Sequence, residues 1–232
     1  MGTKKHLFFG VLFLAVIIQL GMITPDNDII SKDPFVEKEV VVENGNAEHN
    51  IVKKLSGTIN SKALSFALLG MQNFKNIKQD RLIIIDFSLP STEKRFFVIN
   101  PKTGELVFKT YVAHGQGSGT LYATAFSNKN GSHMSSLGFF KTAETYSGKH
   151  GHSLRLDGLQ PGLNSAARER AVVIHQADYV SKAFIDQNGY LGRSWGCPAL
   201  PSADYNRIIK EISNGTLLLI YHPDLENATA VL

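Results

Sequence analysis

Residues 193–200 read Arg-Ser-Trp-Gly-Cys-Pro-Ala-Leu and contain the single cysteine of the chain. Gly196 allows backbone angles that are closed to other residues, and Pro198 fixes the segment on the other side of Cys197. A nucleophilic thiol needs such a stiff turn, because its sulfur must be exposed while nearby N–H groups point at the developing oxyanion. This setting favours a reactive Cys197 over the more common role of a lone cysteine, a small buried apolar side chain.

The thiolate is the reactive form of cysteine, so a base must lie within hydrogen-bond reach of Cys197. Residues 170–175, Arg-Ala-Val-Val-Ile-His, predict a buried strand that ends at a histidine. A histidine at a strand end is more often structural than catalytic. Its pairing with the only cysteine nevertheless makes His175 the candidate base.

The patterns around these two segments predict a mainly β domain with a few helices. One helical pattern begins at Ser61, and Ser202 can cap a second helix that runs to Asn214, with Gly215 at its end. Residues 114–158 are rich in Gly, Ser and His and lack a period, and a stretch of this kind usually forms or covers a site. Strands are expected over residues 81–87, 95–100, 105–113, 170–175 and 216–221.

The N-terminal residues predict export. Lys4 and Lys5 precede an uncharged apolar stretch, so residues 1–24 resemble a signal peptide. The apolar residues 7–23 are also just long enough for an uncleaved membrane anchor. We therefore expect an exported protein, which in a bacterium would lie in the periplasm or cell envelope. Polar residues 25–60 predict a linker, which leaves residues 61–232 as one globular domain.

Composition excludes several classes of protein and site. A single cysteine permits no internal disulfide and no zinc site built from two or more thiolates. The net charge of +4 is mild and no basic run occurs, so we expect no nucleic-acid partner. The length of 232 residues allows one sizeable core and leaves the oligomeric state open.

Two motifs resemble a known family. The histidine at 175 followed by Ser194-Trp195-Gly196-Cys197-Pro198 is similar to the signature of YkuD-type L,D-transpeptidases, in which a His precedes a Ser/Thr-His-Gly-Cys element. Residues 135–140 (Ser-Ser-Leu-Gly-Phe-Phe) and 148–151 (Gly-Lys-His-Gly) resemble the branch of murein L,D-transpeptidase catalytic domains. The resemblance spans roughly residues 60–223.

The sequence departs from the commoner motif in two ways. Trp195 replaces the second His, and the spacing from His175 to Cys197 is a few residues longer. The upstream His is the base in this family, so the replacement of the second His by Trp195 need not harm catalysis. It removes one polar contact and affects the choice of substrate. The longer connection predicts a different lid over the site.

The resemblance implies a β-sandwich and a ping-pong reaction on peptidoglycan stem peptides, without metal or cofactor. Cys197 would attack the carbonyl before the terminal D-Ala of a stem tetrapeptide, and His175 would protonate the departing D-Ala. The N–H groups of Gly196 and Cys197 would hold the oxyanion. An amine of a second stem peptide or of a protein lysine would accept the acyl group.

The resemblance also suggests residues that contact the substrate. Ser194 and Trp195 would line the pocket, and Arg193 could hold a carboxylate through two hydrogen bonds. Gly138 and His152 face the substrate by their position in the resembling stretch.

Three alternatives stay open. Water in place of the amine gives an L,D-carboxypeptidase. A zinc peptidase could use His150, His152 and Asp157, with His114 or His133 as a further ligand. The third is a wall-binding module that has kept the fold without the activity.

Overall fold

The computed structural model describes residues 45–148 and 151–227. The predicted signal or anchor, residues 1–24, and the linker up to residue 44 lie outside the described residues. Within the described ranges, no helix combines the length and the apolar character needed to cross a membrane.

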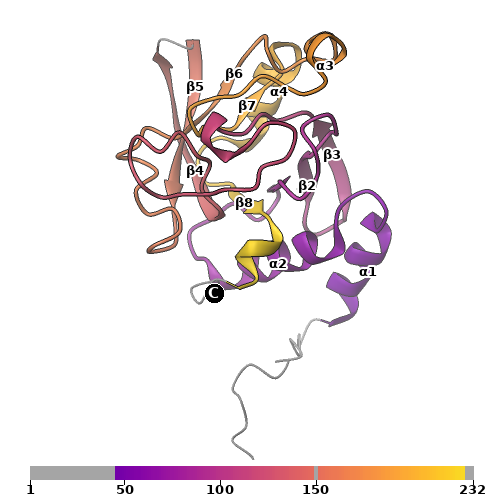
Figure 1. Cartoon of the computed structure of the whole chain (residues 1–232). Coiled ribbons are helices and arrows are strands. Elements are labelled where there is room, and N and C mark those ends of the chain that lie inside the picture. The colour runs from indigo at the N-terminus through magenta and orange to yellow at the C-terminus, as the bar shows by residue number, and fades with distance from the viewer. Residues whose placement is uncertain (1–44, 149–150, 228–232) are drawn as a thin grey trace, which may run out of the picture. The chain divides into compact units, whose positions relative to one another are not determined.

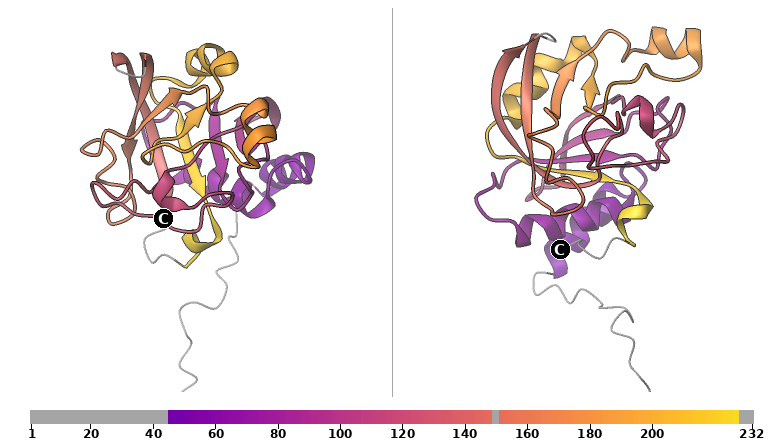
Figure 2. Two further views of the ribbon diagram at one scale, coloured as in Figure 1. Left: turned by 45° about the horizontal axis from the view of Figure 1, so that its top comes forward. Right: turned by 60° about the vertical axis from the view of Figure 1, so that its left-hand side comes forward.

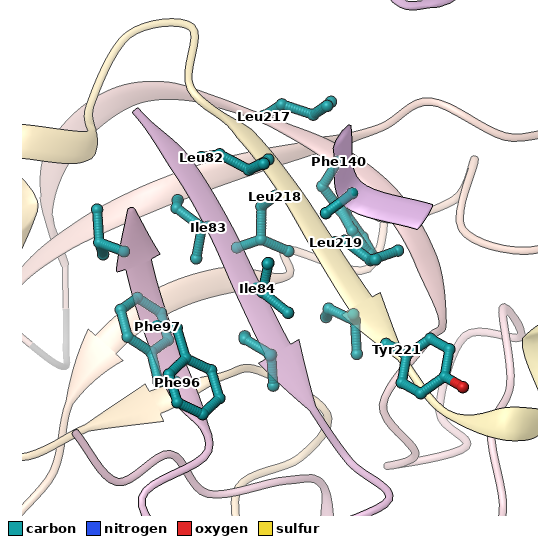
Figure 3. Packing of buried hydrophobic residues seen from close by; sticks show 14 of the residues in the cluster. Leu82, Ile83, Ile84, Phe96, Phe97, Phe140, Leu217, Leu218, Leu219 and Tyr221 are labelled. Atoms are coloured by element: carbon teal, nitrogen blue, oxygen red, sulfur yellow. The ribbon is translucent and has the colours of Figure 1, made fainter. Parts of the chain in front are cut away.

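The centre of the fold is a pair of parallel strands, β1 (Leu82–Asp86) and β8 (Leu217–Tyr221). Every residue of both strands is buried, because other parts of the chain cover both faces of the sheet at this point. β2 (Phe96–Asn100) pairs with β1 on the side opposite to β8. Figure 3 shows how the apolar side chains of these three strands pack together.

Eight strands form one mixed sheet in the order β3-β2-β1-β8-β4-β5-β6-β7. Beyond β3, Ala113 bridges to Ala199 in β7, and the Ala113 N–H donates to the Ala199 carbonyl at 2.9 Å. The segment that follows β3 is thereby connected to β7, the strand at the other end of the order, and the sheet wraps around the core. The remaining strands are β3 (Glu105–Thr110), β4 (Gly138–Gly148), β5 (Gly151–Gly158), β6 (Val173–Gln176) and β7 (Ala199–Leu200).

Helices cover two ends of this sheet, as Figure 1 shows. α2 (Ser61–Asn73) begins after Asn60, whose side chain accepts the N–H groups of Lys62 and Ala63. Its buried face packs on β1 and β8. α4 (Ser202–Ile212) packs its buried face near β6, and α3 (Lys182–Asn188) precedes β7.

The mainly β class with a few helices is confirmed, whereas two regions differ from the sequence predictions. Residues 45–55 form helix α1 (Gly45–Leu55), whose Ile51 and Leu55 join the core, although the segment was predicted as linker. The supposedly irregular residues 114–158 contain the long hairpin of β4 and β5. Figure 2 shows this hairpin along one side of the domain, with its outer end beside β6.

Candidate active site

Strands β6 and β7 bring His175 and Cys197 together. His175 pairs with Ala199 in the parallel ladder, and its N–H donates to the carbonyl of Pro198 at 3.3 Å. The candidate base, His175, is therefore hydrogen-bonded through its backbone to the residue that follows the candidate nucleophile, Cys197. Both side chains line one open cavity of about 420 Å³.

The turn that carries Cys197 is built around Gly196 and Ser194. Gly196 has φ of +116°, a backbone conformation that side-chain-bearing residues rarely adopt. The Ser194 hydroxyl accepts the Gly196 N–H at 3.1 Å and donates to the Cys197 carbonyl at 2.6 Å. Buried Ser135 donates to the Gly196 carbonyl at 3.3 Å, which ties the turn to the loop before β4.

The Cys197 sulfur lies against the start of β6. The N–H of Val173 donates to Sγ at 3.5 Å, and Sγ lies 3.7 Å from the carbonyl oxygen of Ala171. Ala171 has φ of +53°, a strained conformation for a residue with a Cβ. The Val173 N–H stabilises a thiolate at this position, whereas the Ala171 carbonyl accepts the S–H of the neutral thiol, so the two contacts act in opposite directions.

His175 is held in an orientation suited to a base. It is 4% exposed, and its Nδ1 lies 2.9 Å from the carbonyl oxygen of Gln176. A carbonyl only accepts, so the proton of the neutral ring is assigned to Nδ1. Nε2 then carries the lone pair that can take a proton from the thiol.

Three polar side chains that were not predicted from the sequence also line the cavity: Arg170, Tyr146 and Tyr179. Burial, together with the charge of Cys197, raises the pKa of Tyr179 to about 12. Arg170 opens the predicted strand that ends at His175, and that position was the one available signal for it. The tyrosines come from β4 and from the loop after β6, and no local sequence pattern relates them to Cys197.

A comparison with known families identifies the family of this domain. The profile described as L,D-transpeptidase catalytic domain matches residues 55–221 of the chain. The chain belongs to the L,D-transpeptidase catalytic domain family. It is thus a member of a family of peptidoglycan-modifying enzymes.

Several solved structures resemble this L,D-transpeptidase domain. An L,D-transpeptidase from Mycobacterium smegmatis is 15% identical over 62% of this chain and 59% of its own, with a TM-score of 0.39. One from Xylanimonas cellulosilytica is 15% identical over 69% and 68%, with a TM-score of 0.37. The helical cell shape determining protein of Campylobacter jejuni is 14% identical over 67% and 53%, with a TM-score of 0.40.

The present chain therefore spans about 59% of the length of the Mycobacterium smegmatis protein. No curated protein matches it.

The structure brings some of the predicted substrate-contacting residues of the L,D-transpeptidase domain together and separates others. Arg193, Ser194 and Trp195 line the same cavity as His175 and Cys197. Gly138 does not, because it is buried at the start of β4, where a Cβ would meet the Gln160 side chain at 2.2 Å. The prediction that it faces the substrate is corrected accordingly.

The prediction for His152 is corrected in the same way. His152 lies on β5 opposite Ser147, and its ring packs edge-on against Tyr205 with centroids 6.4 Å apart. It is not among the residues that line the cavity. Strand alternation explains the difference, because His175 pairs with the next residue, Ser153, and adjacent residues point to opposite faces.

The ring of Trp195 forms part of the cavity rim. Its side chain is 66% exposed, and the ring stacks on His133 with centroids 4.8 Å apart and planes 8° apart. This position holds a histidine in the commoner family motif. Here it presents a flat apolar surface beside the nucleophile.

The zinc-site alternative has no geometric support among the described residues. Across residues 45–148 and 151–227, no group of three His, Cys, Asp or Glu side chains is placed to hold a metal ion. His114 is buried against Arg95, and Asp157 pairs with Arg168. His150 lies outside the described residues.

Proposed function

We propose that this domain is an exported peptidoglycan L,D-transpeptidase with Cys197 as nucleophile and His175 as base. The observation that carries the proposal is the backbone link from His175 to Pro198, which fixes the base beside the nucleophile at one open cavity. Family membership supplies the class of substrate, the stem peptides of peptidoglycan.

The first half-reaction forms a thioester. His175 Nε2 takes the thiol proton, and the thiolate attacks the carbonyl carbon before the terminal D-Ala of a tetrapeptide stem. The carbon–sulfur bond forms, the carbon–nitrogen bond breaks, and the imidazolium returns its proton to the departing D-Ala amine. Peptide and thiol are thereby converted to thioester and free D-Ala.

The second half-reaction restores the enzyme. An acceptor amine of another stem peptide attacks the thioester carbonyl and passes a proton through His175 to the departing sulfur. A new amide bond replaces the thioester. Water as acceptor would give a shortened stem peptide by the same steps.

Two backbone N–H groups, those of Gly196 and Cys197, are the candidate donors to the oxyanion. The N–H of Gly196 donates to Ser194 Oγ, so this group can serve the oxyanion only if the hydroxyl turns away. We assign the Cys197 N–H as the first donor, because it belongs to the residue whose sulfur is attacking. Gly196 would join it as the tetrahedral intermediate forms.

Arg193 remains our candidate for binding a substrate carboxylate. Its Nη1 donates to the Gly119 carbonyl at 3.2 Å and lies 3.3 Å from Thr120 Oγ1, and the side chain lines the cavity. These acceptors are neutral, so the guanidinium can still attract an anionic group of the stem peptide.

Residues 1–24 are proposed as a signal peptide or anchor and residues 25–44 as the connection to the domain. N-terminal sequencing of the mature protein from a bacterial envelope fraction tests this proposal. A mature chain that begins near residue 25 supports a cleaved signal, and an intact N-terminus in the membrane pellet supports an anchor. Recovery of the intact chain in the cytoplasm alone would contradict export.

The decisive experiment for function is mass spectrometry of tetrapeptide muropeptides incubated with the full chain and with its Cys197→Ala variant. Cross-linked dimers with loss of D-Ala, formed by the wild type alone, support the transpeptidase. Release of D-Ala without dimers would identify a carboxypeptidase. No change with a folded wild type would contradict both activities and point to a binding module.

A further inference from the structure

Arg170 occupies the turn that leads into β6, directly before the strained Ala171. Its N–H donates to the Ala166 carbonyl at 2.9 Å, and its half-buried side chain lines the cavity with Cys197. The backbone that places the Ala171 carbonyl near the sulfur thus also directs the Arg170 side chain into the cavity.

The guanidinium of Arg170 is held by four neutral acceptors. Nη1 donates to the Ser127 carbonyl at 2.8 Å and to the Ser136 hydroxyl. Nη2 donates to the Met134 carbonyl at 2.7 Å and to Ser132 Oγ at 3.4 Å. Arg170 therefore connects the loop of residues 127–136 to the nucleophile side of the cavity.

The same guanidinium lies against the backbone of the nucleophile turn. A Cβ placed on Gly196 would meet Arg170 Nη2 at 3.3 Å and the Met134 carbonyl oxygen at 2.7 Å. Glycine is therefore required here to let the cation and the loop approach the residue immediately before Cys197.

The positive charge of Arg170 is not neutralised by a carboxylate. None of the ion pairs formed within residues 45–148 and 151–227 includes this residue. Burial lowers the pKa of Arg170, and the Cys197 charge is the group that opposes this effect. Burying a charge without an opposite charge costs free energy, so a partly buried cation with no carboxylate partner next to the Gly196 backbone requires an explanation.

We propose that Arg170 is a positioning residue that supplies the fixed positive charge favouring the thiolate form of Cys197, while its hydrogen bonds hold the 127–136 loop against the nucleophile turn. A cation near a thiol favours ionisation, and guanidinium keeps its charge throughout the working pH range. The inference deepens the proposed function, because it rests on Cys197 as the nucleophile.

Other charged or titratable side chains line the same cavity as Cys197. His175 comes from β6, Tyr146 from β4, Tyr179 from the loop after β6, and Arg193 from the segment before the nucleophile. Burial raises the pKa of Tyr179, and His175 changes its charge in the proposed reaction. Arg170 is distinguished from Arg193 by its contact with the Gly196 backbone.

The rate of alkylation of the full chain by iodoacetamide, followed across pH, measures the ionisation of Cys197. We expect Arg170→Gln to raise the apparent thiol pKa by about one unit, which slows alkylation roughly tenfold at pH below both values. Arg170→Lys retains the charge and should titrate close to the wild type. A folded Arg170→Gln protein that titrates as the wild type does would overturn the proposal.

Arg168→Gln is the matched control. Arg168 lies two residues away, and its charge is paired with Glu144 and Asp157. Its removal should leave the thiol titration unchanged, and a shift equal to that of Arg170→Gln would show a general charge effect and overturn the specific role. Ser136→Ala removes one contact of the guanidinium and keeps its charge, so it should lower the melting temperature without moving the thiol pKa.

If Arg170→Gln does not fold, Arg170→Lys decides the question. A folded Lys variant with the wild-type titration supports the role of charge, and one whose thiol pKa rises by a full unit contradicts it. Alkylation needs no peptidoglycan, so this inference and the proposed activity can fail separately. A chain whose thiol titrates as predicted but does not act on muropeptides would leave Arg170 assigned and the transpeptidase proposal rejected.

Discussion

The hydroxyl of Ser194 donates to the carbonyl oxygen of Cys197 at 2.6 Å and thereby closes the nucleophile turn. The hydroxyl oxygen of Ser194 also accepts the Gly196 N–H at 3.1 Å. One buried side chain thus determines the shape of the turn and the availability of a backbone donor. The family element has Ser or Thr at this position, and this geometry gives a physical reason for a hydroxyl there.

Replacement of Ser194 by Ala should therefore loosen the turn. Loss of these two hydrogen bonds should cost about 1–2 kcal/mol of stability. We expect acyl transfer to fall more than stability alone explains, because the sulfur and the oxyanion donors lose their alignment. Ser194→Thr retains the hydroxyl and serves as control, measured by thermal melting and muropeptide turnover. Wild-type turnover by a folded Ala variant would contradict this role.

Replacement of Cys197 by Ala should abolish acyl transfer and leave the fold intact, because it removes one small group at the edge of a cavity. His175→Ala should lower turnover by roughly a hundredfold or more, the usual effect of losing a general base. Intact-protein mass spectrometry provides the second readout, since an acyl adduct should form on the wild type and not on Cys197→Ala. Turnover by the Cys197→Ala protein would remove the basis of the mechanism.

Gly196→Ala should be destabilising and inactive for two separable reasons. The backbone angle alone costs about 1–2 kcal/mol for a residue with a Cβ. The new methyl group would also meet the Met134 carbonyl oxygen at 2.7 Å. Gly131→Ala is the matched control, because Gly131 has φ of +72° and nothing within 4 Å of the added atom. Denaturant unfolding should show a larger loss for Gly196→Ala, and equal losses would argue against the close packing.

Buried His114 should make the domain sensitive to acid. Burial, aided by the charge of Arg95, lowers the pKa of His114 from 6.5 to about 3. The folded state therefore resists protonation that the unfolded chain accepts, so stability is full above pH 6.5 and falls as the pH drops from 6.5 towards 3. At pH 5 the loss from this group is about 2 kcal/mol.

Buried Asp86 acts in the opposite sense, because burial raises its pKa and protonation in the folded state gains stability as the pH falls. The two effects are separated by His114→Asn, whose side-chain oxygen can accept the Arg95 N–H that His114 Nδ1 accepts at 2.7 Å. We expect the unfolding free energy of this variant to change less between pH 7 and pH 5. An unchanged pH slope would exclude His114 as the source.

Replacement of Trp195 by Ala should affect substrate binding more than thiol chemistry. The ring is exposed and stacks on His133, so its loss opens the rim without disturbing the core. We predict a higher KM for muropeptides and an unchanged rate of Cys197 alkylation. Trp195→Phe keeps an aromatic surface and should retain most of the affinity. A selective fall in kcat would instead place the ring close to the reacting atoms.

The sequence was informative where the physical determinants are local. The helix that begins at Ser61 and the apolar strands near β1 and β8 follow from side-chain periodicity, and both were found correctly. The second helix ends at Ile212 rather than Asn214, because the backbone of Ser213 is extended, with ψ of 158°. Such ends depend on backbone angles that composition indicates only to within a few residues.

The features of the fold and the site that the sequence did not predict depend on tertiary contacts. The β4–β5 hairpin has a register shift between Thr142 and Thr145, which interrupts the alternation that would identify a long strand. The sequence pattern predicts Arg170 as the start of a strand, whereas the residue lies in a turn. Its position near Cys197 depends on the tertiary fold and is not visible in the local sequence. The motif around Cys197 is contiguous in the sequence and can be recognised there. The residues that surround Cys197 in space come from distant segments and cannot be predicted in this way.

The pairing of β1 with β8 has a consequence for how the chain acquires its structure. Leu82 lies beside Leu217, so the middle of the sheet joins segments from opposite ends of the domain. Such non-local pairing slows folding, because a long loop must close before the contacts compensate for the lost entropy. A chain that emerges from a ribosome or a secretion channel N-terminus first would stay without its central sheet, and without activity, until residues 217–221 have appeared.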